Sequence, residues 1–504
     1  MDAINNLVLG FSIALSAANL FWCFVGVFLG TIVGVLPGLG PPATIALLLP
    51  LTFKMDPTTA MIMMAGIYYG AKYGGSTTSI LLNVPGESAS VVTCLDGYQL
   101  ARQGRAGPAL GIAAIASFVA GSFGVLGLMF MAPPVARFAL RFGPPEYFAL
   151  MVVGLAMVVF LTGRSMVKGV LATLVGLWLA GVGTDVFTAQ SRFTFGHMEL
   201  LDGIDFIVVS IGLFAIGEVL INLESRTGAQ IFKVPRGLRN LLPTLKDLKD
   251  SRFAFVNGSV VGFFIGVLPG AGSTIASFLS YGLEKAFSRN PEMFGAGVIE
   301  GVAAPEGANN SETGGALVPL LTLGIPGSAT TAILLAALHL WGFRPGPLLI
   351  QENPNLFWGL VASMYVGNVM LLVLNLPLVP VFAQILKVPY FVLYPAIFGI
   401  SIIGAYSISN SLFDVWMLGI FGLLGYFMRK LDYPAAPLVL GMVLGKRLEL
   451  ALRQSLMMSQ GRLSILVGRP LSAAMLLFAV VLLFMPMLGR VRAWRTRAIE
   501  QELL

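Results

Sequence analysis

Long apolar runs separated by short polar breaks constrain this 504-residue chain more than any other feature. Hydrophobic residues make up 57% of the sequence and charged residues 11%, whereas a soluble domain carries about 25% charged residues. A membrane-spanning helix needs about 20 apolar residues, so the chain is predicted to be an all-α polytopic membrane protein with about 10–12 transmembrane helices. The clearest apolar runs are 7–36, 109–132, 146–162, 167–183, 204–222, 254–269, 357–386, 390–406, 412–428 and 470–488.

The charged residues indicate membrane orientation rather than nucleic-acid binding. The net charge is +7, but Lys and Arg lie in short clusters between apolar runs, which is the pattern that sets topology. The most basic polar stretch, 224–252, is predicted to be a cytoplasmic linker. The first apolar run, 7–36, is longer than the 7–15-residue core of a signal peptide, so we interpret it as the first membrane helix. Two cysteines and two histidines indicate neither a disulfide framework nor a metal site.

Two short motifs occur in the same order in both halves of the chain. Gly-Val-Leu-Pro-Gly-Leu-Gly at 34–40 returns as Gly-Val-Leu-Pro-Gly-Ala-Gly at 266–272. Leu-Asn-Val-Pro-Gly at 82–86 is paralleled by Leu-Gly-Ile-Pro-Gly at 323–327. Such spacing predicts two structural repeats.

The predicted organisation follows from these repeats. An N-terminal segment without Lys or Arg and a basic central linker favour an odd number of crossings in the first half, and so an inverted second half. The predicted parts are a first transmembrane repeat (1–223), the linker (224–252), a second transmembrane repeat (253–469), and a C-terminal helix with a basic tail (470–504).

The first shared motif predicts a helix that is broken at membrane depth. Lipid cannot satisfy the freed backbone groups, so such a break is buried or lines a wet cavity. Matched broken helices in two halves indicate a transporter site, and the helix N-terminus after each break favours an anion. The alternative is a kink that serves only helix packing. The candidate site residues here are Gly38, Gly40, Gly270, Gly272, Ser273 and Thr274.

Hydroxyl side chains gather just before the second shared motif of the first half. The eight-residue segments on either side of Pro85-Gly86 reach only about 12 Å as helices, so we expect a re-entrant hairpin with its tip at this dipeptide. Small hydroxyls there suit carboxylate oxygens or a dehydrated Na⁺, although they can also bond to helix carbonyls. The candidates are Ser76, Thr77, Thr78, Asn83, Pro85, Gly86, Glu87 and Ser88.

The second half carries a similar polar segment, 300–331, which ends in the same kind of Pro-Gly tip. Carboxylates within a membrane are functional candidates by default, but Glu300 and Glu306 fit a solvated loop equally well. Glu312 repels an anion when it is ionised, so we expect it to hold Na⁺ or a proton near Asn310. Isolated Lys72 either attracts an anion or reaches toward the interface. The candidates are Asn309, Asn310, Glu312, Thr313, Pro326, Gly327, Ser328, Thr330 and Thr331.

These motifs resemble the large membrane subunit (TctA) of the tripartite tricarboxylate transporters over about residues 10–490. The resemblance implies a permease subunit in the bacterial inner membrane that works with a small transmembrane subunit and a periplasmic solute-binding protein. It also implies secondary import of tricarboxylates or related small organic acids, with Na⁺ or H⁺ as the coupling ion and no other cofactor. Lys72 departs from the uncharged residue expected there. The matching segments are 34–40, 68–87, 94–108, 266–273, 305–313 and 324–327.

Three alternatives remain open at the level of sequence. An intramembrane enzyme would need a nucleophile with a base, an acidic pair or a metal cluster. The chain has no His-Glu-x-x-His motif and only two isolated histidines, so it is predicted not to be an enzyme. A channel would rely on oligomeric symmetry or rings of charge. A transporter that works without a binding protein differs only in its partners.

Overall fold

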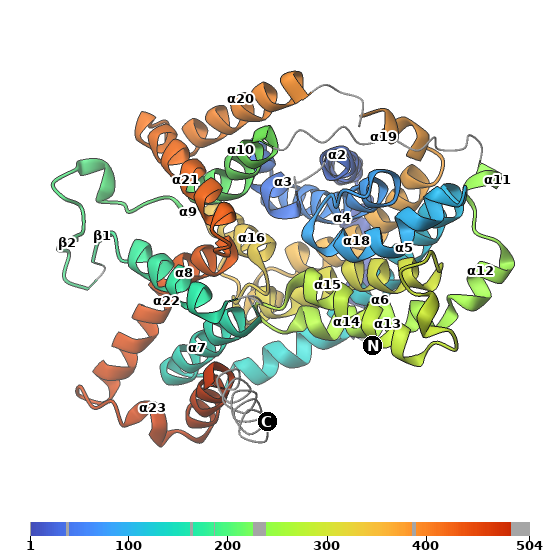
Figure 1. Ribbon diagram of the computed structural model, residues 1–504. Helices are drawn as coiled ribbons and strands as arrows, with labels where there is room; N and C mark the ends of the chain where they lie inside the picture. The colour runs from blue at the N-terminus through green and yellow to red at the C-terminus, as the bar shows by residue number, and fades with distance from the viewer. Residues whose placement is uncertain are drawn as a thin grey trace, which may run out of the picture. The chain divides into compact units, whose positions relative to one another are not determined.

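The computed structural model describes residues 2–36, 40–161, 165–185, 187–224, 238–385 and 390–484. They form two compact units, Met1–Leu140 with Asp205–Leu431 and Arg141–Ile204 with Asp432–Leu504. Helices dominate both units, which confirms the all-α prediction (Figure 1). These units are groups of segments that contact one another, and they do not compare the two halves of the sequence. The division into two sequence repeats therefore stays a prediction.

The larger unit contains the polar motifs of both halves. Its first part comprises α1 (Asp2–Ala14), α2 (Ala17–Val35), α3 (Pro41–Leu48), α4 (Pro57–Leu82), α5 (Val91–Arg102) and α6 (Ala106–Ala139). Its second part comprises α9 (Phe206–Ser210), a π-helical turn (Ile211–Ile216), α10 (Gly217–Glu224), α11 (Leu238–Leu241), α12 (Leu245–Asp250), α13 (Arg252–Val267), α14 (Gly272–Phe287), α15 (Glu300–Leu323), α16 (Ala329–Leu340), α17 (Leu349–Glu352), α18 (Pro354–Asn375), α19 (Val379–Ile385), α20 (Tyr390–Ser409) and α21 (Leu412–Lys430).

The smaller unit is built from helices around one short hairpin. Its helices are α7 (Pro144–Leu161), α8 (Met166–Ala180), α22 (Ala435–Met458), α23 (Ile465–Gly468) and the apolar helix Pro470–Phe484, and its strands are β1 (Gly183–Thr184) and β2 (Ser191–Arg192). Asp185, just after β1, forms ion pairs with Arg192 and Arg453 and accepts the N–H groups of Phe187 and Thr188. Hydrogen bonds to its carboxylate, led by the Thr188 N–H, hold the pKa of Asp185 well below its usual range.

Four described helices, α2, α6, α18 and α21, are long and apolar enough to cross a membrane by length and composition. Nine shorter apolar helices accompany them. The predicted total of about 10–12 crossings stays a prediction. Two of the apolar runs contain a break that the sequence analysis missed. The run 7–36 divides after α1, where the Asn19 side chain donates to the Ile13 carbonyl, and the run 357–386 divides after α18.

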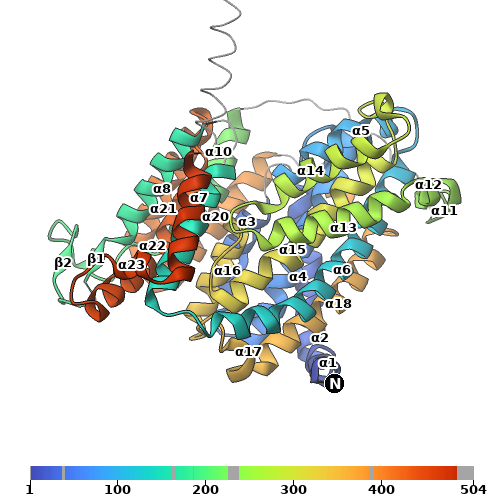
Figure 2. The same cartoon turned by 90° about the horizontal axis from the view of Figure 1, so that it is seen from below.

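Glycines bring helix backbones into contact at matching places in both halves. A Cβ at Gly30 of α2 would lie 2.5 Å from the Ile67 carbonyl oxygen of α4, and a Cβ at Gly262 of α13 would lie 2.4 Å from the Ala308 carbonyl oxygen of α15. Neither position therefore tolerates a side chain without displacement. Helix α15 lies between α13 and α6 (Figure 2). The other glycines at four-residue spacing on the same faces are Gly26 and Gly34 in α2 and Gly258 and Gly266 in α13.

The two Pro-Gly turns also occupy matching positions. Asn83 caps the end of α4 and Gly324 caps the end of α15, both in the left-handed conformation, with φ values of 57° and 67°. A Cβ at Gly86 would lie 2.7 Å from the Gly34 carbonyl oxygen, and a Cβ at Gly327 would lie 3.2 Å from the carbonyl oxygen of Gly266. The elements thus recur in the same order, while the inverted relation between them stays a prediction.

The expectation of two short hairpin arms was wrong for the first arm. Residues 76–83 are not a separate segment, because 76–82 form the end of the 26-residue helix α4, which is about 39 Å long. Only the returning arm is short, since α5 has 12 residues. The hydrophobic period could not reveal this length, because α4 is buried on all sides and so has no polar face.

A loop from the second half is fastened to α5 of the first half. Asp96 is fully buried and accepts the Tyr281 hydroxyl at 2.9 Å. The same carboxylate accepts the backbone N–H groups of Gly295, Gly297 and Val298 at 2.8–3.0 Å. These four bonds fix the segment that leads into α15.

Candidate functional site

A buried ion pair joins α4 to α15. The Lys72 ammonium lies 2.6 Å from Glu312 Oε2, and the two side chains are 0% and 1% exposed. Among the described residues, Lys72 is the one buried basic side chain. The partners are 240 positions apart in sequence and belong to different predicted repeats. Glu312 was predicted as a site residue, but its pairing with Lys72 was not.

Tyr68 and Asn309 complete the surroundings of this pair. The Tyr68 hydroxyl donates to Glu312 Oε2 at 3.2 Å, and the Lys72 ammonium lies 4.7 Å from the centre of the Tyr68 ring. Lys72 also donates to the Asn309 carbonyl oxygen at 2.6 Å. Ser328, just after the second Pro-Gly turn, interacts with the Tyr68 hydroxyl. The pair is therefore held by groups from both halves.

Glu87, which directly follows the first Pro-Gly turn, contacts Asn309 next to the Lys72–Glu312 pair. Its Oε1 accepts the Asn309 amide at 2.6 Å, and the residue is 8% exposed. A Cβ at Gly40 would lie 3.5 Å from the Glu87 Cβ, so the start of α3 adjoins this carboxylate. Pro41 and Pro42 have no N–H to donate. A helix does begin after the first break, but its N-terminus offers an anion fewer donors than expected.

Glu306 forms a second buried carboxylate centre on α15, the helix that also carries Glu312. It is fully buried, and it accepts the hydroxyl groups of Ser76 from α4 and Thr93 from α5. A solvated loop was one of the two interpretations left open for Glu306, and burial excludes it. Asn310, one turn further along α15, donates to the Ser117 hydroxyl at 2.8 Å.

Several buried oxygen atoms along α15 have no hydrogen-bond partner among the described residues. They include one carboxylate oxygen, two amide oxygens and one hydroxyl. A buried polar atom without a partner costs about 1–3 kcal/mol, so such a group indicates a place for water or an ion. Oxygen atoms of these types are the ligands that hard cations prefer. The atoms are Asn309 Oδ1, Asn310 Oδ1, Glu312 Oε1 and Thr313 Oγ1 on α15, with the Tyr69 hydroxyl on α4.

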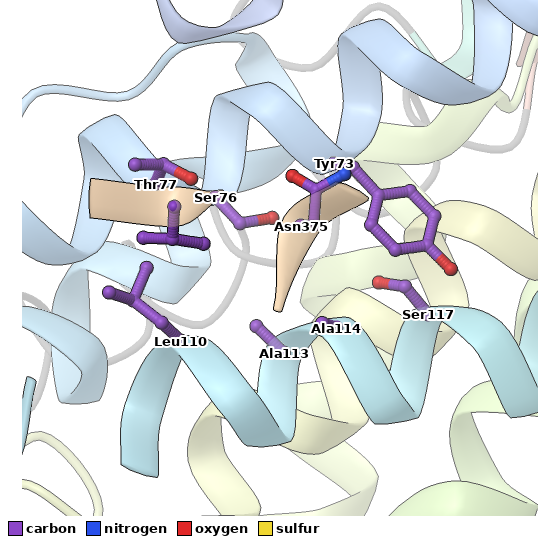
Figure 3. Close-up of a pocket in the computed structure, with 9 residues that line it drawn as sticks. Tyr73, Ser76, Thr77, Leu110, Ala113, Ala114, Ser117 and Asn375 are labelled. Atoms are coloured by element: carbon purple, nitrogen blue, oxygen red, sulfur yellow. The ribbon is translucent and has the colours of Figure 1, made fainter. Parts of the chain in front are cut away.

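A small cavity with a few polar groups in a mostly apolar wall lies beside Ser76. Its volume of about 10 Å³ suits one water molecule. Figure 3 shows Ser76 and Thr77 from α4, Ser117 from α6 and Asn375 from α18 around it. Ser76 therefore contacts both the cavity and Glu306. The role of Ser76 and Thr77 in ligand binding stays a prediction.

Other predicted residues stabilise the helices. Thr78 donates to the Val35 carbonyl oxygen at 2.6 Å and so fastens α4 to the end of α2. Thr331 and Ser328 cap the start of α16 through reciprocal hydrogen bonds. Asn83 and Ser88 are exposed. Gly38 lies outside the described residues. The remaining candidates are placed as follows: Pro85, Gly86, Pro326 and Gly327 form the two turns, Thr330 is buried in α16, Gly270 precedes α14, and Gly272, Ser273 and Thr274 begin it.

Sequence reasoning left Lys72 and Glu306 out of the site. The sequence did contain a signal for Lys72, which is the only basic residue between Lys54 and Arg102. A lone charge in an apolar stretch is costly unless it has a partner. The partners of Glu306 carried no such signal, because Ser76 and Thr93 are neutral and lie in separate helices. Among the described residues, no three His, Cys, Asp or Glu side chains are grouped to hold a metal ion.

Comparison with known proteins identifies the family of the chain. Residues 20–440 match the tripartite tricarboxylate transporter TctA family. The chain belongs to this family. TctA proteins are transporter subunits of tripartite systems, so the chain is a multi-pass transporter subunit that acts with other subunits. This confirms the resemblance seen in the motifs.

Two relatives of this TctA chain come from Agrobacterium vitis. One, described as "Uncharacterized 52.8 kDa protein in TAR-I ttuC' 3'region", is 47% identical over 502 residues, which cover 100% of both chains. The other, "Uncharacterized protein in TAR-II ttuC' 3'region", is 43% identical over 241 residues, which cover 48% of this chain and 100% of that protein. No solved structure matches the chain.

Proposed function

We propose that this chain is the permease subunit of a binding-protein-dependent secondary transporter in the bacterial inner membrane. It imports tricarboxylates or related small organic acids, and a Na⁺ or H⁺ gradient drives the import. Its partners are a small transmembrane subunit and a periplasmic solute-binding protein, and it catalyses no covalent reaction. The observation that carries this proposal is the fully buried Lys72–Glu312 pair, set among hydroxyl and amide groups in a TctA protein.

Lys72 is the group that receives a substrate carboxylate. An organic anion that enters a buried site loses its water and needs donors or a positive charge in return. The Lys72 ammonium supplies the charge, while Ser76, Thr77 and Asn310 supply donors nearby. A substrate carboxylate therefore competes with Glu312 for the same ammonium group.

The coupling cation takes the place that Lys72 leaves. Once Lys72 turns to the substrate, Glu312 is a buried carboxylate without a counter-charge, which costs several kcal/mol. Na⁺ or H⁺ at Glu312 removes that cost. The unpaired oxygens of Asn309, Asn310 and Thr313 supply further ligands for Na⁺. Anion binding and cation binding thus stabilise one another, which is the thermodynamic basis of symport.

The proposal is tested with the full complex in liposomes. Labelled citrate and smaller dicarboxylates are offered with the binding protein, and the Na⁺ and H⁺ gradients are collapsed separately while ATP is supplied. Uptake should fail when the coupling gradient is collapsed. Uptake that survives the loss of both gradients would contradict the proposal. Full uptake without the binding protein would instead support a transporter that works alone.

A further inference from the structure

The buried charges around Lys72 do not balance. Glu312 and Glu306 are both fully buried, and Glu87 is nearly so, yet Lys72 is the one buried basic side chain among the described residues. Glu312 takes that charge at 2.6 Å. No basic side chain of the described part of the chain forms an ion pair with Glu306. A buried ionised carboxylate without a counter-charge is costly enough that such a group neutralises instead.

The hydrogen bonds of Ser76 point to the same conclusion. Its hydroxyl oxygen reaches both Glu306 Oε2 and, at 3.4 Å, the Lys72 carbonyl oxygen, but it has only one proton to donate. A neutral Glu306 satisfies both contacts. Its O–H donates to Ser76 Oγ, and Ser76 then donates to the Lys72 carbonyl oxygen. Thr93 donates to the other carboxyl oxygen in either case.

Ser76 links the cavity in Figure 3 to this carboxyl. The cavity holds the volume of about one water molecule, and Ser76 lies in its wall. A proton carried by such a water passes to Ser76 Oγ while the Ser76 proton passes to Glu306 Oε2. The carboxylate becomes a carboxylic acid, the proton-carrying water becomes a neutral water, and no other protein group changes its charge. Thr93, in α5, donates to the other oxygen of Glu306, Oε1, and does not line the cavity.

We propose that Glu306 is a proton-binding site of this transporter: it is protonated in the conformation described here, and it exchanges its proton through Ser76 during the transport cycle. The coupling part of this inference rests on the proposed function, and the protonation part does not. Lys72 and Tyr73 on α4, Glu87 before α5, and Cys94 on α5 are the titratable groups that act on Glu306. Of these, only Lys72 carries a positive charge, and its ammonium group forms an ion pair with Glu312.

Infrared difference spectroscopy of the purified full chain tests the protonation directly. A neutral buried carboxyl has a C=O absorption that ionised carboxylates lack. Glu306→Gln should lower this absorption by one carboxyl, whereas the matched variant Glu312→Gln should leave it unchanged, because Glu312 is paired with the Lys72 ammonium. Thr93→Val should shift the band without removing it, since it deletes one hydrogen bond to the same group.

Uptake measurements test the coupling. In liposomes with the full complex, Glu306→Gln should lose the difference between uptake with and without an imposed pH gradient. A protonated-carboxyl absorption that is unchanged in Glu306→Gln, or no shift in Thr93→Val, overturns the proposal. Wild-type pH-gradient dependence in Glu306→Gln also overturns it. If the wild-type complex takes up no carboxylate at all, the proposed function fails, and the infrared result alone decides whether Glu306 binds a proton.

Discussion

Removing the charge of Lys72 should separate its role in stability from its role in transport. At 2.6 Å, the Lys72–Glu312 attraction is about 6 kcal/mol for an effective dielectric constant of 20. Desolvation offsets much of that, but breaking a buried pair on one side costs about 3–5 kcal/mol, because the other charge stays buried alone. Lys72→Met should therefore lower the free energy of unfolding by that amount.

The double variant Lys72→Met/Glu312→Gln is the matched control for this loss. It removes both charges, and replacing a whole buried pair by neutral groups of similar volume is often neutral or stabilising. Its stability should return to within about 1 kcal/mol of the wild type, the usual net value of a hydrogen bond such as that from Tyr68. Denaturant unfolding in lipid or detergent measures all three proteins.

Transport by the same variants then tests the role of Lys72 in binding. Both the single and the double variant should fail to accumulate carboxylate, because neither has an ammonium group at the site. A double variant that regains stability and also regains uptake would show that Lys72 has only a structural role. A Lys72→Met protein as stable as the wild type would refute the electrostatic reasoning itself.

Three further outcomes follow from the packing and the polar contacts. Gly262→Val should lower the unfolding midpoint by the equivalent of about 1–3 kcal/mol or more, whereas Gly282→Ala, with open space around it, should not lower it. Asp96→Ala should expose the loop before α15 to proteases, because it frees three backbone N–H groups and the Tyr281 hydroxyl. The pKa of Asp185 is lowered in the folded protein, so the bonds of its carboxylate stabilise the loop after β1 fully above the unfolded pKa of about 3.9, and this stabilisation is lost as the pH falls through the folded pKa. Proteolysis of this loop at a series of acidic pH values, compared with the Asp185→Asn variant, measures the loss.

The helical class and the matched turns could be predicted from sequence because they depend on local signals. Each of the ten apolar runs overlaps at least one described helix, and Pro-Gly dipeptides fall in the turns after α4 and α15. Helix α15 itself was harder to predict. Its polar and glycine-rich sequence is compatible with a loop, yet residues 301–322 are all buried. Its helical form depends on the helices that surround it, and a sequence contains no local signal for that.

The site was predictable in residue type but not in pairing. Hydroxyl, amide and carboxylate side chains in an apolar region indicate function wherever they occur. Which of them meet depends on the rotation of α4 against α15, and a change of one residue turns a helical side chain by about 100°. Ser76 therefore meets Glu306, while Thr78, two residues later, faces α2. The sequence alone cannot separate these two neighbours.

The contacts of α15 differ in kind from one side to the other. Toward α6 and α13 the backbones touch: a Cβ at Gly124 would lie 2.7 Å from the Ser311 carbonyl oxygen, and one at Gly262 would lie 2.4 Å from that of Ala308. Toward α4 the contact is made by long or hydroxylated side chains, chiefly Lys72 and Ser76.

Close backbone packing has few alternative arrangements, whereas an ion pair and hydroxyl bonds can break and re-form as their charges are neutralised. We therefore expect the boundary between α4 and α15 to be where this transporter opens. A cation at Glu312 removes the attraction between that carboxylate and Lys72, and loss of the proton from Glu306 leaves a buried charge that favours entry of water. On the proposed function, ion binding and opening are one event, because the carboxyl groups proposed to bind the ions, Glu312 and Glu306, also hold the two helices together.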